Sequence, residues 1–301
     1  MNVLNLIRWK NLLMIALVQL LIKYAFLEPF GVNFGLTTLQ ILILILATIC
    51  IAAAGNVIND IYDVETDFVN KPDNIIIGKS ISEKTAYNLF IALNVVGVGL
   101  GYYLSQSVGK SAFFSIFVII SALLYVYASY LKQTFLIGNI IVSALVALSI
   151  VVVGIFELLP VITPENRQTL FTFFKIILDY ALFAFIINLI REIAKDIEDI
   201  DGDYKAGMRT LPIIIGRKRA GNILFILTLF PLFAVSYYVI NSLYKNQVAV
   251  IYFLVFIIAP LLYISIKSFS AETKKEYHHI SNVLKLVMLF GMFSLLLYKY
   301  N

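Results

Sequence analysis

Stretches of about twenty predominantly apolar residues recur along the whole of this 301-residue chain. A stretch of that length crosses the hydrocarbon core of a bilayer as an α-helix, which satisfies its own backbone hydrogen bonds there. Hydrophobic residues make up 61% of the sequence, more than a soluble domain of this size needs. We therefore expect an all-α, multi-pass transmembrane bundle in which residues 1–301 form a single integral membrane domain. The spanning segments are predicted at roughly 12–30, 39–58, 85–105, 111–131, 139–158, 169–190, 221–241, 247–267 and 281–299.

The basic residues indicate how such a bundle is oriented. Of the 23 Lys and Arg side chains, 16 fall on the side that holds the N-terminus and the connections near 60–84, 132–138, 191–219 and 268–280. By the positive-inside rule this side faces the cytoplasm, so we expect a cell-membrane protein. The net charge of +5 is spread over these short connections and forms no basic arm, so no nucleic-acid partner is predicted.

Acidic residues gather in two places with the same spacing. The first acidic motif consists of Asp60, Asp63 and Asp67, and helical geometry would put these carboxylates on one face. Asn56 and Asn59 precede Asp60 and Asp63 by four residues and extend this motif. The pattern returns 136 positions later as the second acidic motif, made of Glu192, Asp196, Asp199 and Asp203.

Like charges this close repel one another unless a cation lies between them. An all-oxygen set of ligands suits Mg²⁺, which commonly joins a few carboxylates to the phosphates of a substrate. Both motifs fall on the predicted cytoplasmic side, after long apolar runs. The sequence therefore predicts a diphosphate held between metal ions on opposite sides of one central cavity.

Several cations accompany the two motifs. Lys71 lies in the loop after the first motif, and Lys132 is the charged residue of the next cytoplasmic connection. Arg8 precedes the first spanning segment and could point inward toward a phosphate or anchor the helix at the headgroups. Arg191 and Lys195 interleave with the second motif, so some of its acids could be salt-bridged rather than bound to metal.

Three further lysines lie within or near apolar runs. Lys23 and Lys175 lie near segment ends, where a lysine is expected to extend its ammonium group toward the interface. Lys285 lies inside the last apolar run, and the sequence suggests no partner for it.

Taken together, these residues resemble the signatures of a known family. The first signature is Asn59-Asp60-x-x-Asp63-x-x-x-Asp67, followed by Asn70-Lys71-Pro72 and Gly78-x-Ser80-Ile81-Ser82. The second is Lys195-Asp196-Ile197-Glu198-Asp199-x-x-Gly202-Asp203, followed by Gly207 and Thr210-Leu211-Pro212. These motifs look like those of the UbiA family of intramembrane prenyltransferases, and the similarity covers essentially the whole chain. Where many members have Arg-Pro after the first signature, this chain has Asn74-Ile75, which removes a cation from that loop.

The resemblance implies nine helices around a cavity open to lipid, and Mg²⁺-dependent transfer of a prenyl group from a prenyl diphosphate. It also implies the residues of the site. Metal ligands would be Asn59, Asp63, Asp67, Asp196, Asp199 and Asp203. Residues binding the substrate diphosphate would be Lys132, Lys71, Arg8, Asn56 and Arg191. All six aspartates of the two motifs would be catalytic, with Asp60 and Glu192 as candidates for taking the acceptor's proton.

The acceptor is the main open question. The run from Arg191 to Asp199 looks most like the geranylgeranylglycerol-phosphate geranylgeranyltransferases of ether-lipid synthesis. An aromatic acceptor, as in quinone or tocopherol-like biosynthesis, is the alternative within the family. An alternative of another class is a cation transporter, since acids within membranes often mark ion paths. A transporter, however, would place its carboxylates near the bilayer midplane.

Overall fold

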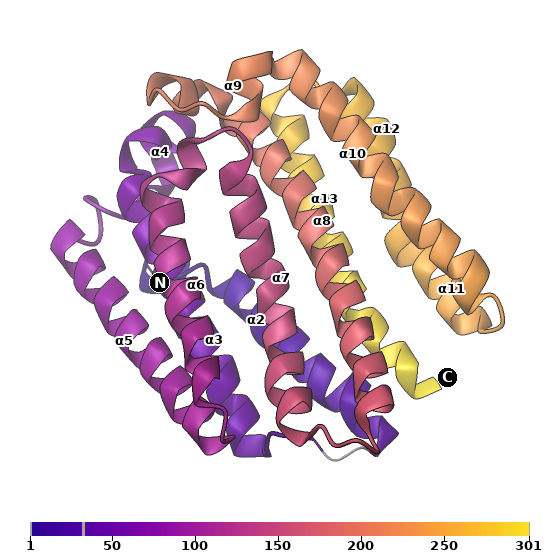
Figure 1. Ribbon diagram of the computed structural model, residues 1–301. Helices are drawn as coiled ribbons and strands as arrows, with labels where there is room; N and C mark the ends of the chain where they lie inside the picture. The colour runs from indigo at the N-terminus through magenta and orange to yellow at the C-terminus, as the bar shows by residue number, and fades with distance from the viewer. Residues whose placement is uncertain (1, 32–33, 301) are drawn as a thin grey trace.

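A computed structural model describes residues 2–31 and 34–300, and the regular elements in this part of the chain are helices (Figure 1). The α-helices are α1 (Asn2–Leu6), α2 (Trp9–Leu20), α3 (Thr38–Tyr62), α4 (Val64–Asn70), α5 (Glu83–Ser107), α6 (Phe114–Ser129), α7 (Ile137–Leu158), α8 (Arg167–Lys205), α9 (Leu211–Ile215), α10 (Arg217–Tyr238), α11 (Gln247–Phe253), α12 (Ala259–Ser270) and α13 (Lys274–Phe293). Short 3₁₀ and π-helical turns extend several of them. An isolated bridge between Ile77 and Ile81 closes the loop after α4.

Among these described residues, nine helical stretches are long and apolar enough to cross a membrane, which confirms the predicted number. They are Trp9–Phe30, Thr38–Tyr62, Glu83–Ser107, Ser111–Ser129, Ile137–Val161, Arg167–Lys205, Arg217–Leu243, Gln247–Ser270 and Lys274–Tyr298. The bounds differ most in the sixth stretch, because α8 continues unbroken for 39 residues. The second acidic motif therefore lies on a helix rather than in the connection expected after residue 190.

The first acidic motif shows the opposite deviation. Its spacing predicted that one helix carries all three carboxylates, but α3 ends at Tyr62 and α4 begins at Val64. Asp63 between them leaves helical geometry, with φ −93° and ψ 0°. Asp60 thus belongs to α3, Asp63 to the bend and Asp67 to α4. The bend turns the chain across the end of the bundle, where α4 packs against α8.

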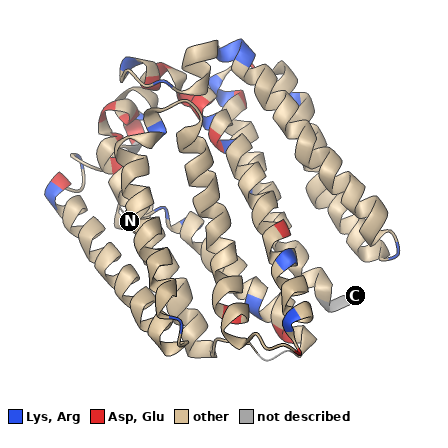
Figure 2. Cartoon of the chain, viewed as in Figure 1, with Lys and Arg blue, Asp and Glu red and all other residues tan. Residues whose placement is uncertain are grey.

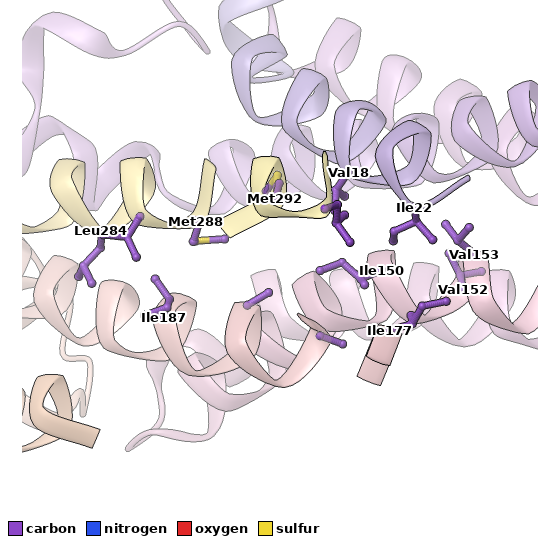
Figure 3. Packing of buried hydrophobic residues seen from close by; sticks show 14 of the residues in the cluster. Val18, Ile22, Ile150, Val152, Val153, Ile177, Ile187, Leu284, Met288 and Met292 are labelled. Carbon is purple, nitrogen blue, oxygen red and sulfur yellow. The ribbon is translucent and has the colours of Figure 1, made fainter. Parts of the chain in front are cut away.

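The half of the bundle away from α4 is filled by apolar packing. Figure 3 shows Val18 of α2 and Ile22 of the π-helical turn that follows it facing Ile150 of α7, with Met288 and Met292 of α13 alongside. All of these side chains are buried. These buried side chains join α2, α7, α8 and α13 into one apolar core. The polar side chains lie mainly at the end of the bundle that holds α4.

Charged side chains gather at one end of the molecule, around α4, α9 and the end of α8 (Figure 2). An exception lies near the other end, where Lys23 contacts Glu157 of α7 at 2.9 Å. Both side chains are buried, and the Lys23 ammonium also donates to the backbone oxygen of Leu36 at 2.8 Å. The expectation that Lys23 extends toward the interface was wrong, because its counter-ion comes from a helix distant in sequence. Lys175 is exposed.

Candidate active site

Both acidic motifs line one cavity of about 890 Å³ at the charged end of the bundle. Every residue predicted for the site contributes to its wall. These residues are Arg8, Asn56, Asn59, Asp60, Asp63, Asp67, Lys71, Lys132, Arg191, Asp196, Asp199 and Asp203. The walls deeper in the bundle are apolar and include Phe117, Ile120 and Leu124. The cavity therefore joins a polar end to an apolar interior.

The side chain of Asn70 holds the two motifs at a fixed separation. Its amide nitrogen donates to the backbone oxygen of Asp199 at 2.9 Å, and its oxygen accepts from the backbone nitrogen of Gly202 at 2.9 Å. Gly202 is required here, since a Cβ atom at this position would overlap the Asn70 side chain. Lys71, the next residue, contacts Asp199 Oδ2 at 2.6 Å. The end of α4 is thus tied to the second motif at three points.

Lys132 reaches the first motif from the loop between α6 and α7. Its ammonium donates to Asp63 Oδ1, while Asn59 donates to Asp63 Oδ2. The loop is tightly built, because Leu136 has a positive φ of 56° and Gly138 lies against the backbone of Lys132. The sequence pointed to Lys132 as a phosphate contact, and the structure places its ammonium beside a proposed metal ligand.

The N-terminal segment closes another side of the cavity. Arg8 adopts a left-handed conformation, with φ 54°, that separates α1 from α2. Its guanidinium contacts Asp60 Oδ1 at 2.7 Å. Asn56, predicted to bind the diphosphate, donates its amide hydrogen to the backbone oxygen of Ile7 at 2.9 Å. In this structure Asn56 therefore positions the segment that carries Arg8.

The second motif lies along α8 and faces α7. Asn139 donates to Asp196 Oδ2 at 2.8 Å, and it joins a buried polar network through Ser143 and Asn188. The site residues predicted from the sequence did not include Asn139, which follows Gly138 in the first turn of α7. Glu192 accepts from Arg191 and Lys195 at 3.1 and 2.8 Å, so this part of the motif is salt-bridged.

The six aspartates carry more charge than their partners neutralise. Arg8, Lys71 and Lys132 pair with three of them, and the other three carboxyl groups form no ion pair with the described residues. Burial, reinforced by the nearby Asp63 carboxylate, raises the pKa of Asp67 to about 6. A cation near Asp67 would relieve both effects, so the electrostatics favour binding of a positive ion.

One oxygen of the second motif is available to a cation. Asp199 Oδ1 is buried and makes no hydrogen bond with the described residues, which leaves it free to coordinate an ion. Within that same part of the chain, no three acidic, His or Cys side chains already converge as a closed metal cluster. An ion bound here would therefore complete its shell with water or substrate oxygens, as Mg²⁺ commonly does in proteins.

Comparison with known proteins identifies the family of this chain. Residues 13–298 match the sequence model of the UbiA prenyltransferase family. Digeranylgeranylglyceryl phosphate synthase of Methanosphaera stadtmanae is 32% identical over 258 residues, which cover 83% of this chain and 86% of the relative.

Solved structures share the fold. One, of a digeranylgeranylglyceryl phosphate synthase, has a TM-score of 0.62 and 24% identity, covering 99% of this chain and 97% of the other. A UbiA homologue from Archaeoglobus fulgidus bound to DMAPP and Mg²⁺ has a TM-score of 0.58 and 18% identity, covering 98% and 99%. The family model matches nearly the whole chain, and both acidic motifs line one cavity. This chain therefore belongs to the UbiA prenyltransferase family and is a multi-pass membrane enzyme that transfers prenyl groups.

Proposed function

We propose that this enzyme transfers a geranylgeranyl group from geranylgeranyl diphosphate to the hydroxyl group of geranylgeranylglyceryl phosphate, with Mg²⁺ as cofactor. The observation that carries the proposal is the meeting of both acidic motifs at one cavity beside Lys71 and Lys132. The acceptor is taken from the relative in Methanosphaera stadtmanae, which is similar over most of both chains. Mg²⁺ is supported by the oxygen ligands of the site and by the ion bound with DMAPP in the Archaeoglobus homologue.

Two groups of residues would hold the metal ions. Asn59, Asp63 and Asp67 would serve one ion, and Asp196, Asp199 and Asp203 the other. Bound Mg²⁺ neutralises the diphosphate and stabilises the charge that develops on it as it leaves. These roles agree with the excess of carboxylates over cations at this end of the cavity.

The cations of the chain would assist the leaving group. Lys132 and Lys71 contact Asp63 and Asp199, so each ammonium lies where a metal-bound diphosphate would arrive. Arg8, paired with Asp60, supplies a third positive group. Preorganised charges of this kind stabilise a transition state because they need not reorganise during the reaction.

Bond changes then follow from the chemistry of an allylic diphosphate. Its C–O bond breaks, the electron pair leaves with the diphosphate, and the acceptor oxygen bonds to the allylic carbon. The hydroxyl proton passes to a carboxylate, for which Asp60 and Glu192 remain the candidates lining the cavity. Apolar walls around the prenyl chain exclude water, which would otherwise trap the cationic carbon.

The orientation of the enzyme in the membrane is the second part of the proposal. We place the enzyme in the cell membrane with its acidic motifs toward the cytoplasm, and we treat residues 1–301 as one domain. Lys79 and Lys110 are exposed at opposite ends of the bundle. A cysteine at position 79 should react with a membrane-impermeant maleimide only after the cells are opened, whereas one at position 110 should react in intact cells. The reverse pattern would contradict the orientation.

Activity is tested with purified protein, Mg²⁺ and labelled geranylgeranyl diphosphate. Geranylgeranylglyceryl phosphate, homogentisate and 4-hydroxybenzoate are offered separately, and only the first should give product. Chelation of metal by EDTA should stop the reaction. Asp63→Ala and Asp199→Ala should abolish transfer while Lys275→Met, an exposed change on α13, should not. Product from an aromatic acceptor alone would overturn the proposed acceptor, and turnover by either aspartate variant would overturn the metal assignment.

A further inference from the structure

Lys285 places a positive charge in the middle of α13 without an acidic partner. Its ammonium donates to Asn11 Oδ1 at 2.6 Å and forms no ion pair with any described residue. The neighbouring Leu284 and Met288 point into the apolar packing (Figure 3), while Lys285 lines the cavity. An uncompensated charge within a spanning helix is costly and is usually kept for a function.

Two more cations face the same part of the cavity from α8. Arg191 and Lys195 share the single carboxylate of Glu192, and the Nε atom of Arg191 is buried without a hydrogen-bond partner. Arg191, Lys195 and Lys285 together exceed Glu192 by two positive charges. Arg191, Lys195 and Lys10 all repel the Lys285 ammonium. This wall of the cavity therefore carries more positive charge than the carboxylate of Glu192 offsets.

Lys285 and Arg191 lie away from the acidic end of the cavity, and Lys195 lies between them and that end, next to Asp196 in sequence. His278 of α13 contacts Glu198 of α8 at 3.0 Å, which fixes how the two helices align. Lys285 follows His278 by seven residues, and Arg191 precedes Glu198 by seven. At 1.5 Å per residue, both cations lie about 10 Å deeper in the cavity than Glu198 and the adjacent Asp199. The acidic end binds cations, and this deeper level has the opposite charge.

We propose that Lys285, Arg191 and Lys195 bind the phosphate monoester of the acceptor, at a subsite distinct from that of the metal-bound diphosphate. The inference rests on the proposed function, whose acceptor carries a phosphate on its glycerol. It assigns Arg191 to the acceptor rather than to the diphosphate, for which its place in the acidic run had suggested it. The spacing suits the reaction, because the glycerol carbons and a reacting pair about 3 Å apart must fit between the two anions.

The subsite gives the enzyme a means of choosing its acceptor. Charge-assisted hydrogen bonds to the phosphate would favour the phosphorylated lipid over the same lipid alcohol without phosphate. A site that forms such bonds discriminates strongly against a ligand that lacks the group, because its excess positive charge would then stay uncompensated inside the cavity. An aromatic acceptor without an acidic group would leave this wall equally unsatisfied.

The test compares Lys285→Met with wild type on two acceptors, geranylgeranylglyceryl phosphate and geranylgeranylglycerol. With the phosphorylated acceptor, the variant should raise the acceptor KM by about tenfold to a hundredfold, the usual effect of losing a hydrogen bond to a charged group. The KM for geranylgeranyl diphosphate should not change, and the two proteins should be alike on geranylgeranylglycerol. Lys285→Arg should recover most of the affinity, and Lys275→Met on the same helix is the control.

Three results would overturn the inference. A higher KM for geranylgeranyl diphosphate would mean that Lys285 serves the leaving group. An equal rise in KM for both acceptors would mean a structural role for Lys285. So would a Lys285→Met variant that fails to fold, if Lys285→Arg then recovers no affinity for the phosphorylated acceptor. Equilibrium binding of labelled geranylgeranylglyceryl phosphate to the metal-free protein separates this test from the proposed function. Binding that depends on Lys285 in a protein using another acceptor would refute only the proposed function, whereas binding independent of Lys285 would refute the subsite.

Discussion

The buried pair of Lys23 and Glu157 offers the sharpest test of how this bundle is held together. Lys23 is 4% exposed and Glu157 is fully buried, so neither charge is solvated by water. Leu36 completes the arrangement, because its oxygen accepts from Lys23 at 2.8 Å and its nitrogen donates to Glu157 Oε2 at 3.1 Å. Removing one partner from such a pair leaves an isolated charge buried inside the bundle.

The size of the effect follows from what each change leaves behind. Lys23→Met leaves the carboxylate without a counter-ion, with the Leu36 nitrogen as its donor, and Glu157→Gln leaves the ammonium without a counter-ion, with the Leu36 oxygen and a neutral amide oxygen as acceptors. Breaking a buried pair in this way costs about 3–5 kcal/mol. The double variant removes both charges and keeps an amide that can still bond to Leu36. We expect it to lie within about 1 kcal/mol of wild type.

Unfolding of the four proteins in the same detergent, followed by intrinsic fluorescence against denaturant, measures these differences. We expect the free energy of unfolding to fall markedly in each single variant and to recover in the double variant. Such recovery would show strong energetic coupling between the two positions. Single variants as stable as wild type, or a double variant that loses the sum of both, would refute the reasoning. Prenyl transfer by the double variant should remain, because Glu157 lies at the end of α7 opposite Asn139, the partner of Asp196.

Three further predictions concern the active site. Gly202→Ala should push Asn70 out of its two hydrogen bonds, cost about 1–3 kcal/mol in an unfolding assay and lower kcat; an unchanged kcat would argue against the link between the motifs. Gly138→Ala would bring a Cβ atom to 2.7 Å from the Cα of Lys132, so steady-state kinetics should show kcat down by about tenfold or more with the acceptor KM little altered. Because the pKa of Asp67 is about 6, protons compete with metal as the pH falls from about 7 to 5, and Mn²⁺ binding followed by electron paramagnetic resonance should weaken over that range. Asp67→Asn should flatten this dependence, and an equally steep curve in that variant would rule out Asp67 as its source.

Much of the architecture could be predicted from the sequence, because spanning helices are specified by local composition. Nine apolar runs gave the right number of spans, and the repeated spacing of the aspartates pointed to two motifs facing one cavity. What failed was local shape. The spacing of Asp60, Asp63 and Asp67 is compatible with a helix, but it cannot reveal that the chain bends at Asp63.

Partnerships between distant residues were also out of reach. Lys23 and Glu157 are 134 positions apart, and Asn11 and Lys285 are 274 apart. A lone lysine near the end of an apolar run is typical of a side chain that reaches for the interface, since nothing local identifies its counter-ion. Only the folded bundle brings the π-helical turn after α2 to α7, and α2 itself to α13.

Asn70 also bears on which ions the enzyme can use. One amide group of α4 is bonded to two backbone atoms of α8, so the protein itself sets the gap between the motifs. Ca²⁺ prefers longer bonds, about 2.3–2.6 Å, and more oxygens than Mg²⁺, so under the proposed function a shell of Ca²⁺ ligands would have to stretch these two hydrogen bonds. A preference for the smaller ion would then come from the backbone, and the carboxylates would adjust only by rotating about their own bonds.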